Sequence, residues 1–278
     1  MTPSKPLDNF PVIRTSDPAA VRDTLARVYA APTLQLGGGS TALNARMNEC
    51  RLPNIMLAYG SYGGDVLLDF PAVDCFVHLL VLDGNAEITS RNQSVPLSAA
   101  KSVSISPDAG YRAKYSADYE GLLLKIHPRA LTNKLAALTG ANVDQPLRVS
   151  LQPNGTLSAQ LLRLYLPVLA RALSDAVRPL PDWWLAQTEQ LLTLMFLHAS
   201  QHAYSHLLEQ DAPDLAPWQV RLAESYIEAN CQRAITLEGL AKVTGVSAFS
   251  LFRAFRKSRG YSPLQFASHL RAKRDWQQ

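Results

Sequence analysis

The side chains most able to act together chemically lie on a predicted helix over residues 248–257. This helix carries small, polar and basic residues close together. Short side chains on such a helix can reach base edges in the major groove of DNA, and nearby cations can meet phosphates. The base-edge candidates are Ala248, Phe249, Ser250 and Arg253, and the candidates nearer phosphates are Lys242, Ser247, Phe252, Arg256 and Lys257. This residue pattern is typical of a DNA-reading helix.

Two short helical patterns joined by a tight turn would position these side chains. Thr236 is suited to cap the first helix, and Ser247 the second. Gly245 between them can take the positive φ that a sharp turn needs. Leu251 and Phe255 lie four residues apart and form a stripe for burial, which turns the basic face outward. The segment therefore matches a helix-turn-helix arrangement.

The charge of the chain is unevenly distributed. Residues 218–278 contain ten Lys/Arg and four Asp/Glu, a net charge of +6, whereas the remaining residues carry a net charge of −2. A basic module on a mildly acidic body favours a polyanion partner for that module alone. The alternative is a basic face that is simply solvated.

Composition and length indicate an ordinary globular protein. At 278 residues, with 47% hydrophobic and 18% charged residues, the chain is long enough for two domains. No apolar run approaches the roughly 18–20 residues that span a bilayer, and residues 1–15 have no apolar signal core. Three widely separated cysteines without CxxC spacing indicate reduced thiols. We expect a cytoplasmic protein without a membrane partner.

From residue 43 to 126 the sequence alternates short β-type runs with turn residues. Such spacing predicts an antiparallel barrel or a double-sheet jelly roll, whose interior can hold one small ligand. The expected strands are residues 54–60, 65–70, 75–82, 86–91, 101–106 and 119–126.

Helical periodicity returns after residue 128. Two long helices are expected over residues 158–175 and 182–208, with Pro167 kinking or shortening the first. They can cover the barrel, form a dimer seam, or both. An acidic, Pro-rich stretch marks the clearest boundary. The predicted organisation is an effector-binding domain over residues 1–150, a helical dimerisation segment over 151–210, a linker over 211–217 and a helix-turn-helix domain over 218–278.

Candidate ligand-binding residues occur in the β-rich region. Tyr59, His78 and Leu80 are expected to point into the barrel and form the wall of a small-molecule site. Arg46 or Arg51, just before the first expected strand, can meet a carboxylate in a bidentate pair.

Evidence for catalysis or metal binding is weak in this sequence. His198, His202 and His206 follow an i, i+4, i+8 spacing that can hold Zn²⁺, although a polar stripe facing solvent or a partner is the favoured interpretation. Phosphate-cradling loops, nucleophile elbows and paired carboxylates are not recognisable. We therefore expect no enzyme activity, no metal and no cofactor.

The C-terminal motifs also resemble a known family. ITLEGLA (235–241), GVS (245–247), Leu251-x-Arg253-x-Phe255 and Gly260-x-Ser262-Pro263 resemble the first helix-turn-helix of the AraC/XylS family of bacterial transcription regulators. SYGG (61–64), the run to SPDAG (106–110), and YSADYEGLLLKI (115–126) are similar to the effector domain of its XylS-like branch. The resemblance covers about residues 20–278.

This resemblance implies an α+β chain with a cupin-like effector domain, a helical dimerisation segment and two helix-turn-helix units joined by a linker helix. XylS-like members respond to small aromatic carboxylates and activate catabolic operons. The implied partners are double-stranded DNA, a small-molecule effector, a second subunit and, for an activator, RNA polymerase.

The sequence departs from the family pattern in two ways. It ends at Gln278 within the expected linker helix, so either it is a truncated product or it reads DNA with one unit per subunit. Phe249 stands where a polar or basic residue is usual, so it either contacts a thymine methyl or packs against another module. Two alternatives follow: a ligand-binding or dimerising partner without independent DNA binding and, more distantly, a cupin-type enzyme.

Overall fold

The structure is a computed structural model. It describes residues 5–29, 33–37, 43–139, 143, 145–152, 155–176, 180–209, 217–233 and 235–275. The chain divides into two compact units, Met1–Leu131 with Leu147–Ala203, and Thr132–Pro146 with Tyr204–Gln278. None of the helices in the described residues combines the length and apolarity needed to cross a bilayer.

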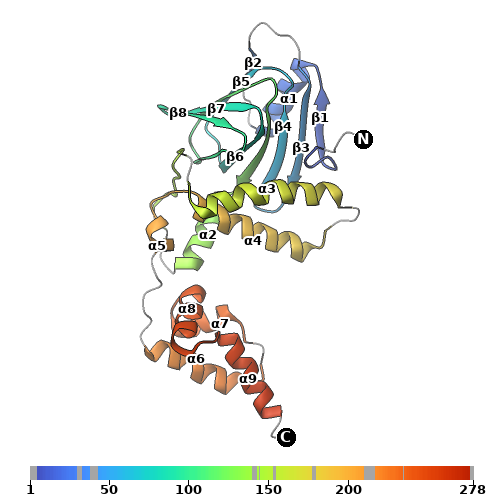
Figure 1. The fold of residues 1–278 in the computed structure, drawn as a ribbon. Coiled ribbons are helices and arrows are strands. Elements are labelled where there is room, and N and C mark those ends of the chain that lie inside the picture. Colours follow the sequence, from blue (N-terminus) through green and yellow to red (C-terminus); the bar gives the residue numbers. More distant parts are fainter. Residues whose placement is uncertain are drawn as a thin grey trace. The chain divides into compact units, whose positions relative to one another are not determined.

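The first unit is a β-sandwich, seen in the upper part of Figure 1. Its strands are β1 (Pro11–Thr15), β2 (Thr33–Leu36), β3 (Ala45–Arg51), β4 (Ile55–Ser61), β5 (Val66–Phe70), β6 (Phe76–Asp83), β7 (Asn85–Ser90), β8 (Gln93–Ser98), β9 (Ser102–Ile105), β10 (Tyr111–Tyr115) and β11 (Glu120–Ile126). One sheet has the order β1-β3-β4-β11-β6-β9 and the other β2-β5-β10-β7-β8, with all pairs antiparallel. The expected cupin-like, double-sheet architecture is confirmed.

Period-two alternation explains how the second sheet faces the core. In β10, Tyr111, Ala113 and Tyr115 are buried, while the two residues between them are exposed. One of these, Arg112, pairs outside the sheet with Asp69 at 2.7 Å. Side chains of opposite faces thus separate into an apolar interior and a charged exterior.

The six expected strands are present, and five further strands were not predicted from the sequence. Three of these five, β1, β2 and β8, lie at sheet edges. These edge strands are only partly covered, so they carry few buried apolar side chains; in β2 only Leu34 is buried. A helix, α1 (Pro18–Tyr29), adds the buried side chains of Val21 and Leu25 to the same core.

Two long helices belong to the first unit, α3 (Leu157–Asp175) and α4 (Asp182–Ala199). The Phe196 ring of α4 lies 5.7 Å from that of Phe76 on β6, so α4 covers the face of the first sheet that points away from the sandwich interior. Pro167 does not shorten α3, which ends at Asp175 as expected. The buried leucines Leu162, Leu166 and Leu169 hold the helix to the unit on both sides of the proline.

The prediction of one helix over residues 182–208 is wrong. The helix α4 ends at Ala199, and the chain then forms a β-bridge between His202 and Val149. The Ser150 N–H donates to the Gln201 carbonyl at 2.9 Å, which draws this backbone out of the helix. A separate short helix, α5 (Ser205–Glu209), follows. Periodicity alone did not reveal this competing backbone partner.

In addition to α5 and to residues from α2 (Pro128–Thr139), the second unit contains α6 (Pro217–Asn230), α7 (Leu237–Thr244), α8 (Ala248–Arg259) and α9 (Pro263–Asp275) (Figure 1). Their small core comprises Val220, Ala223, Ile227, Leu240, Leu251, Phe255 and Ala267. Of the predicted linker, residues 211–216 lie outside the described residues, and Pro217 opens α6.

Candidate functional site

The α7–turn–α8 segment has the local geometry expected from its sequence. The Thr236 hydroxyl accepts a hydrogen bond from the Gly239 N–H at 3.1 Å and caps α7. Gly245 follows α7 with a φ of 68°, the left-handed conformation that glycine adopts at little cost. The Ser247 hydroxyl accepts from the Ser250 N–H at 3.1 Å and caps α8. The three turn and cap assignments are confirmed.

Burial separates the two faces of α8. Leu251 and Phe255 are fully buried, whereas Phe249 is 44% exposed and Arg256 and Lys257 are exposed. The guanidinium carbon of Arg253 lies 5.7 Å from the centroid of the Phe249 ring, a cation–π distance. The outward face of α8 thus combines a partly stacked arginine with further positive charge.

One of the predicted base-edge residues is misplaced. Ser250 is only 8% exposed, and its hydroxyl accepts a hydrogen bond from the Ser247 hydroxyl at 2.8 Å. The Ser250 side chain is buried against the capping hydroxyl of Ser247, so it does not lie on the outward face. Of the other candidates, Lys242 is exposed, and Ser247, Ala248, Phe252 and Arg253 are half-buried.

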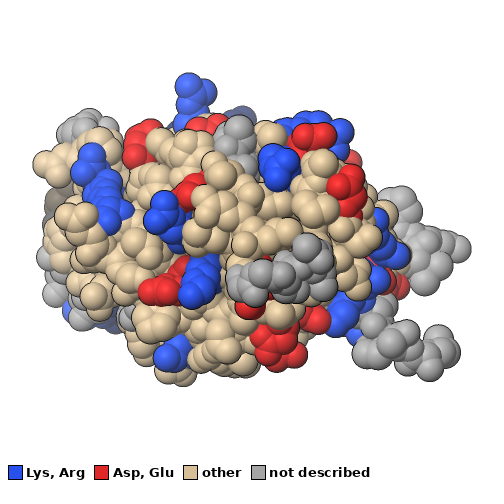
Figure 2. Space-filling model, turned by 90° about the horizontal axis from the view of Figure 1, so that it is seen from above, with Lys and Arg blue, Asp and Glu red and all other residues tan. Residues whose placement is uncertain are grey.

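Not every cation of α8 is available to a polyanion. Arg259 forms a bidentate pair with Glu224 of α6, at 2.6 and 3.0 Å. This contact raises the pKa of Arg259 and keeps its charge against α6. Figure 2 is seen from above Figure 1, on the side of the first unit, and there basic and acidic side chains are interspersed.

The sandwich of the first unit contains a small cavity of about 40 Å³. Three of its lining residues, Tyr62, Tyr115 and Tyr119, stack on one another with centroids 4.1 to 6.2 Å apart. Burial raises the pKa of the Tyr62 and Tyr115 hydroxyls, so both stay neutral at physiological pH. A Cβ on Gly60 would meet no described atom within 4 Å. The cavity therefore presents aromatic faces and neutral hydroxyls beside an open backbone position.

The predicted inward orientation of the Tyr59, His78 and Leu80 side chains is wrong, although Tyr59 is among the residues that line the inter-sheet cavity. The register aligns Tyr59 with Leu122 and Leu122 with Leu80, so these side chains share one face of the first sheet. The interior face of β6 instead carries Val77, Leu79 and Val81. Six consecutive residues of β6 are buried on one face or the other, and such a run gives no alternation from which to identify the interior.

His78 links the sheet to the end of α4. Its Nδ1 lies 3.0 Å from the Ser104 hydroxyl, which lies 3.0 Å from the Ser200 hydroxyl. Its Nε2 has no hydrogen-bond partner among the described residues. Burial, with a smaller contribution from the nearby charge of Arg163, lowers the pKa of His78 to about 4. The neutral, buried imidazole thus joins the first sheet to the end of α4.

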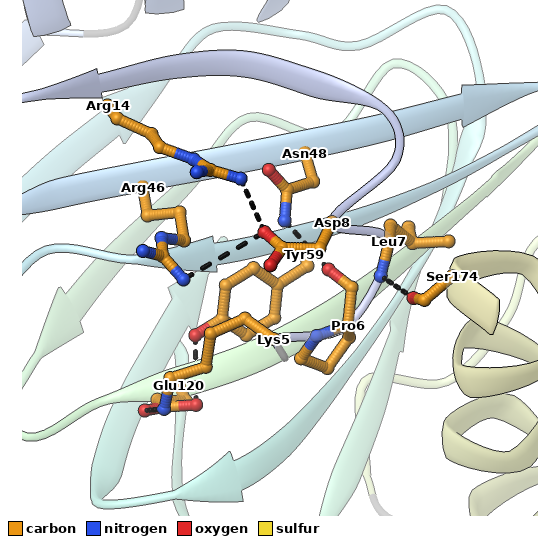
Figure 3. A network of polar contacts seen from close by, with 10 residues as sticks. All are labelled: Lys5, Pro6, Leu7, Asp8, Arg14, Arg46, Asn48, Tyr59, Glu120 and Ser174. Atoms are coloured by element: carbon orange, nitrogen blue, oxygen red, sulfur yellow. Dashed lines mark hydrogen bonds and ion pairs between the residues drawn. The ribbon is translucent and has the colours of Figure 1, made fainter. Parts of the chain in front are cut away.

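The two predicted arginines differ in setting. Arg51 is exposed and pairs with Glu49. Arg46 lines a polar hollow of about 560 Å³ with Lys5, Asp8, Asp118, Tyr119 and Glu120. Of these residues, Figure 3 shows Arg46, Lys5, Asp8 and Glu120. Tyr119 also lines the inter-sheet cavity, so the hollow and the cavity adjoin. Lys5, Asp8 and Glu120 were not singled out from the sequence, because their grouping depends on distant strands meeting.

The three histidines do not share one helix, so the i, i+4, i+8 spacing does not place them on one face. Only His198 belongs to α4, and the Nε2 of His202 lies 3.1 Å from the Leu197 carbonyl. In the described part of the chain, no group of three His, Cys, Asp or Glu side chains is arranged to hold a metal ion.

Comparison with known proteins gives three findings. Residues 21–198 match the family model described as an AraC-binding-like domain. A probable thc operon regulatory protein from Rhodococcus erythropolis is 34% identical over 148 residues, which cover 52% of this chain but only 44% of that protein. The crystal structure of the AraC-like transcriptional activator CuxR superposes with a TM-score of 0.53 at 15% identity, covering 95% of this chain and 93% of the other. The last similarity concerns the fold alone.

Proposed function

Because the chain belongs to the AraC family of transcription regulators, with the AraC-binding-like domain over residues 21–198, we propose that it binds double-stranded DNA through α8 under the control of a small effector. The observation that carries this proposal is the capped α7–turn–α8 segment with its basic outward face. A gel shift of the purified chain with a pool of random duplexes tests it. A protein that shifts none of the pool at low salt would instead fit a ligand-binding or dimerising partner that does not bind DNA.

Phe249 and Arg253 are placed to read bases together. They lie one helical turn apart on the outward face, within 5.7 Å of each other. An arginine donates two hydrogen bonds to guanine, and an apolar ring contacts a thymine methyl. Lys242, Arg256 and Lys257 are assigned to phosphates, and Ser247 and Ala248 lie at the helix N-terminus, where a phosphate is also favoured.

Replacing Arg253 by alanine is expected to relax sequence choice, with a loss of about 1–3 kcal/mol on the selected site and little on random DNA. Replacing Lys257 by alanine should weaken binding on all sequences and lower the salt slope by about 1. Competition gel shifts at several salt concentrations measure both effects. Arg27→Ala, an exposed helical arginine of the first unit, is the matched control. Unchanged selectivity in Arg253→Ala would show that another face of the helix contacts bases.

We place the effector in the inter-sheet cavity and the adjoining polar hollow. The hollow offers Arg46 to a carboxylate, and the tyrosine stack offers faces to an apolar or aromatic body. At about 40 Å³ the cavity holds only a water-sized group, so binding requires Tyr119, which lines both spaces, to move. A small aromatic acid fits this combination.

Replacing Gly60 by valine should fill the cavity without unfolding the protein. The new side chain enters open space, and valine suits a strand. We expect calorimetry with benzoate to give at least about a tenfold loss of affinity, or 1.4 kcal/mol. Gly155→Val, at a glycine that is equally open among the described residues, is the control. Wild-type affinity in Gly60→Val would place the ligand elsewhere.

A second copy of the chain is the partner proposed for α3. Four of its apolar residues are exposed at spacings of four, three and four: Leu157 (70%), Leu161 (48%), Leu164 (69%) and Val168 (65%). Such spacing matches the a and d positions of a coiled-coil seam, which a symmetric pair buries. Leu164→Glu should therefore dissociate the dimer in analytical ultracentrifugation, whereas Gln187→Glu on α4 should not. A wild-type chain that sediments as a monomer would contradict the assignment.

The regulator is further proposed to act in the cytoplasm as an activator of a catabolic operon through RNA polymerase, and not as an enzyme. Transcription in vitro from a promoter carrying the selected site tests the activator role. A fall in transcript on adding protein and effector would assign a repressor instead.

A further inference from the structure

Asp8 places one carboxylate between two arginines. Its Oδ1 accepts a hydrogen bond from Arg14 Nη2 at 2.5 Å and lies 3.9 Å from Arg46 Nη1 (Figure 3). Arg14 comes from β1 and Arg46 from β3, and the two residues are direct partners in the strand register. Two guanidinium groups on paired positions therefore converge on a single oxygen. The 3.9 Å contact is too long for a hydrogen bond, so Asp8 satisfies Arg46 only in part.

Residues 5–9, here called the N-terminal segment, hold Asp8 in this position. The Leu7 N–H donates to the Ser174 hydroxyl of α3 at 2.6 Å. The Asn48 side chain donates to the Pro6 carbonyl at 2.8 Å, and Lys5 pairs with Glu120. Sheet and helix thus both secure the segment.

The conformation of Leu7 shows that this position is held against a cost. Its φ is 58°, in the left-handed region that non-glycine residues rarely adopt. Its side chain is fully buried, which offsets the strain. A segment that combines backbone strain with releasable polar contacts can exchange between bound and free states.

We propose that Arg14 and Arg46 form a carboxylate-binding site that Asp8 occupies from within the chain, and that a monocarboxylic acid displaces Asp8 and releases the N-terminal segment. This inference rests on the proposed effector function and identifies how the acid group is recognised. A free carboxylate can approach Arg46 in the bidentate geometry that Asp8 does not reach. The acids Asp118 and Glu120 also line the hollow, but Glu120 is already matched by Lys5 and by the Tyr59 hydroxyl at 2.9 Å.

The test uses the full chain with sodium benzoate as the probe, and with benzamide as its neutral isostere at equal ionic strength. Amide hydrogen exchange at Leu7 reports release of the segment, because this N–H is bonded to Ser174. Calorimetry reports binding. Three variants separate the roles: Arg46→Gln removes the site, Asp8→Asn removes the internal carboxylate, and Arg51→Gln is the matched arginine control outside the hollow.

We expect benzoate, but not benzamide, to speed Leu7 exchange roughly two- to fivefold in the wild type and in Arg51→Gln. Asp8→Asn should exchange faster without ligand and bind benzoate more tightly by the same factor, because displacement of Asp8 and binding of benzoate are coupled reciprocally. Arg46→Gln should bind at least about tenfold more weakly and show no exchange response to benzoate.

Benzoate binding that leaves Leu7 exchange unchanged, or that survives intact in Arg46→Gln, would overturn the inference. Absence of binding to both the wild type and Asp8→Asn would also overturn it. Gel shifts on the same samples keep this failure distinct from failure of the DNA-binding proposal. Benzoate binding that depends on Gly60 but not on Arg46 would preserve the cavity as the effector site while rejecting the arginine pair.

Discussion

Phe255→Ala is expected to unfold the second unit and to abolish DNA binding. Phe255 is fully buried in α8, and its ring lies 6.3 to 6.4 Å from those of Phe266 and Tyr261. Truncating a buried phenylalanine costs about 3–5 kcal/mol, since apolar burial is lost and a cavity remains. The core of this unit is small, so that cost is a large fraction of a typical domain stability of about 5–15 kcal/mol.

Phe249→Ala is the matched control, because it makes the same substitution six residues earlier in the same helix. Phe249 is 44% exposed, so its removal should change the free energy of unfolding by no more than about 0.5 kcal/mol. It should still weaken binding to the selected DNA site. Urea denaturation of the full chain, monitored by hydrogen exchange of the α6–α9 amides, measures the free energy of unfolding of both variants. Equal stability of the two variants would mean that the faces of α8 are assigned incorrectly.

The first unit is expected to lose stability as the pH falls from about 6.5 to about 4, on the order of 3 kcal/mol from His78 alone. Burial lowers the pKa of His78 in the folded chain to about 4, below its ordinary value of 6.5. Between these values the unfolded chain binds a proton that the folded chain does not, so acid favours unfolding. The contribution is complete above pH 6.5, where both states are neutral.

His78→Gln should remove this pH dependence, because an amide does not titrate. The variant should be less stable than the wild type at pH 7, where the imidazole fills its site, and the difference should shrink as the pH falls. His127→Gln, which alters an exposed histidine of the same unit, should leave the wild-type slope intact. Urea denaturation at half-unit pH intervals measures the slope. A parallel pair of wild-type and His78→Gln curves would refute protonation of His78 as a cause.

The effector and DNA proposals depend on different parts of the chain and can fail separately. Variants at Gly60 and Arg46 test effector binding by the first unit, and variants at Arg253 and Lys257 test DNA binding by the second. An acid that binds the first unit without changing the gel shift would leave both sites standing and remove only the coupling between them.

Local sequence determined the α7–turn–α8 segment well. Thr236, Gly245 and Ser247 act on backbone groups within a few residues, so their roles follow from residue type and spacing. The stripe of Leu251 and Phe255 was likewise readable, because helical periodicity alone fixes which side chains share a face. Ser250 was misassigned because capping competed for a side chain that periodicity alone could not place.

The proposed effector site could not be predicted in this way. Tyr59, His78 and Leu80 were assigned to the interior, but strands buried on both faces carry no alternation that marks the inner side. The meeting of Asp8 with Arg14 and Arg46, and of Lys5 with Glu120, joins residues up to 115 positions apart. Strand order and register decide such contacts, and both depend on the free energy of the whole sandwich rather than on any one stretch. The sequence alone therefore determined the caps, the turn and the two faces of the α7–turn–α8 segment, whereas only the tertiary structure decided which side chains gather at the proposed ligand site.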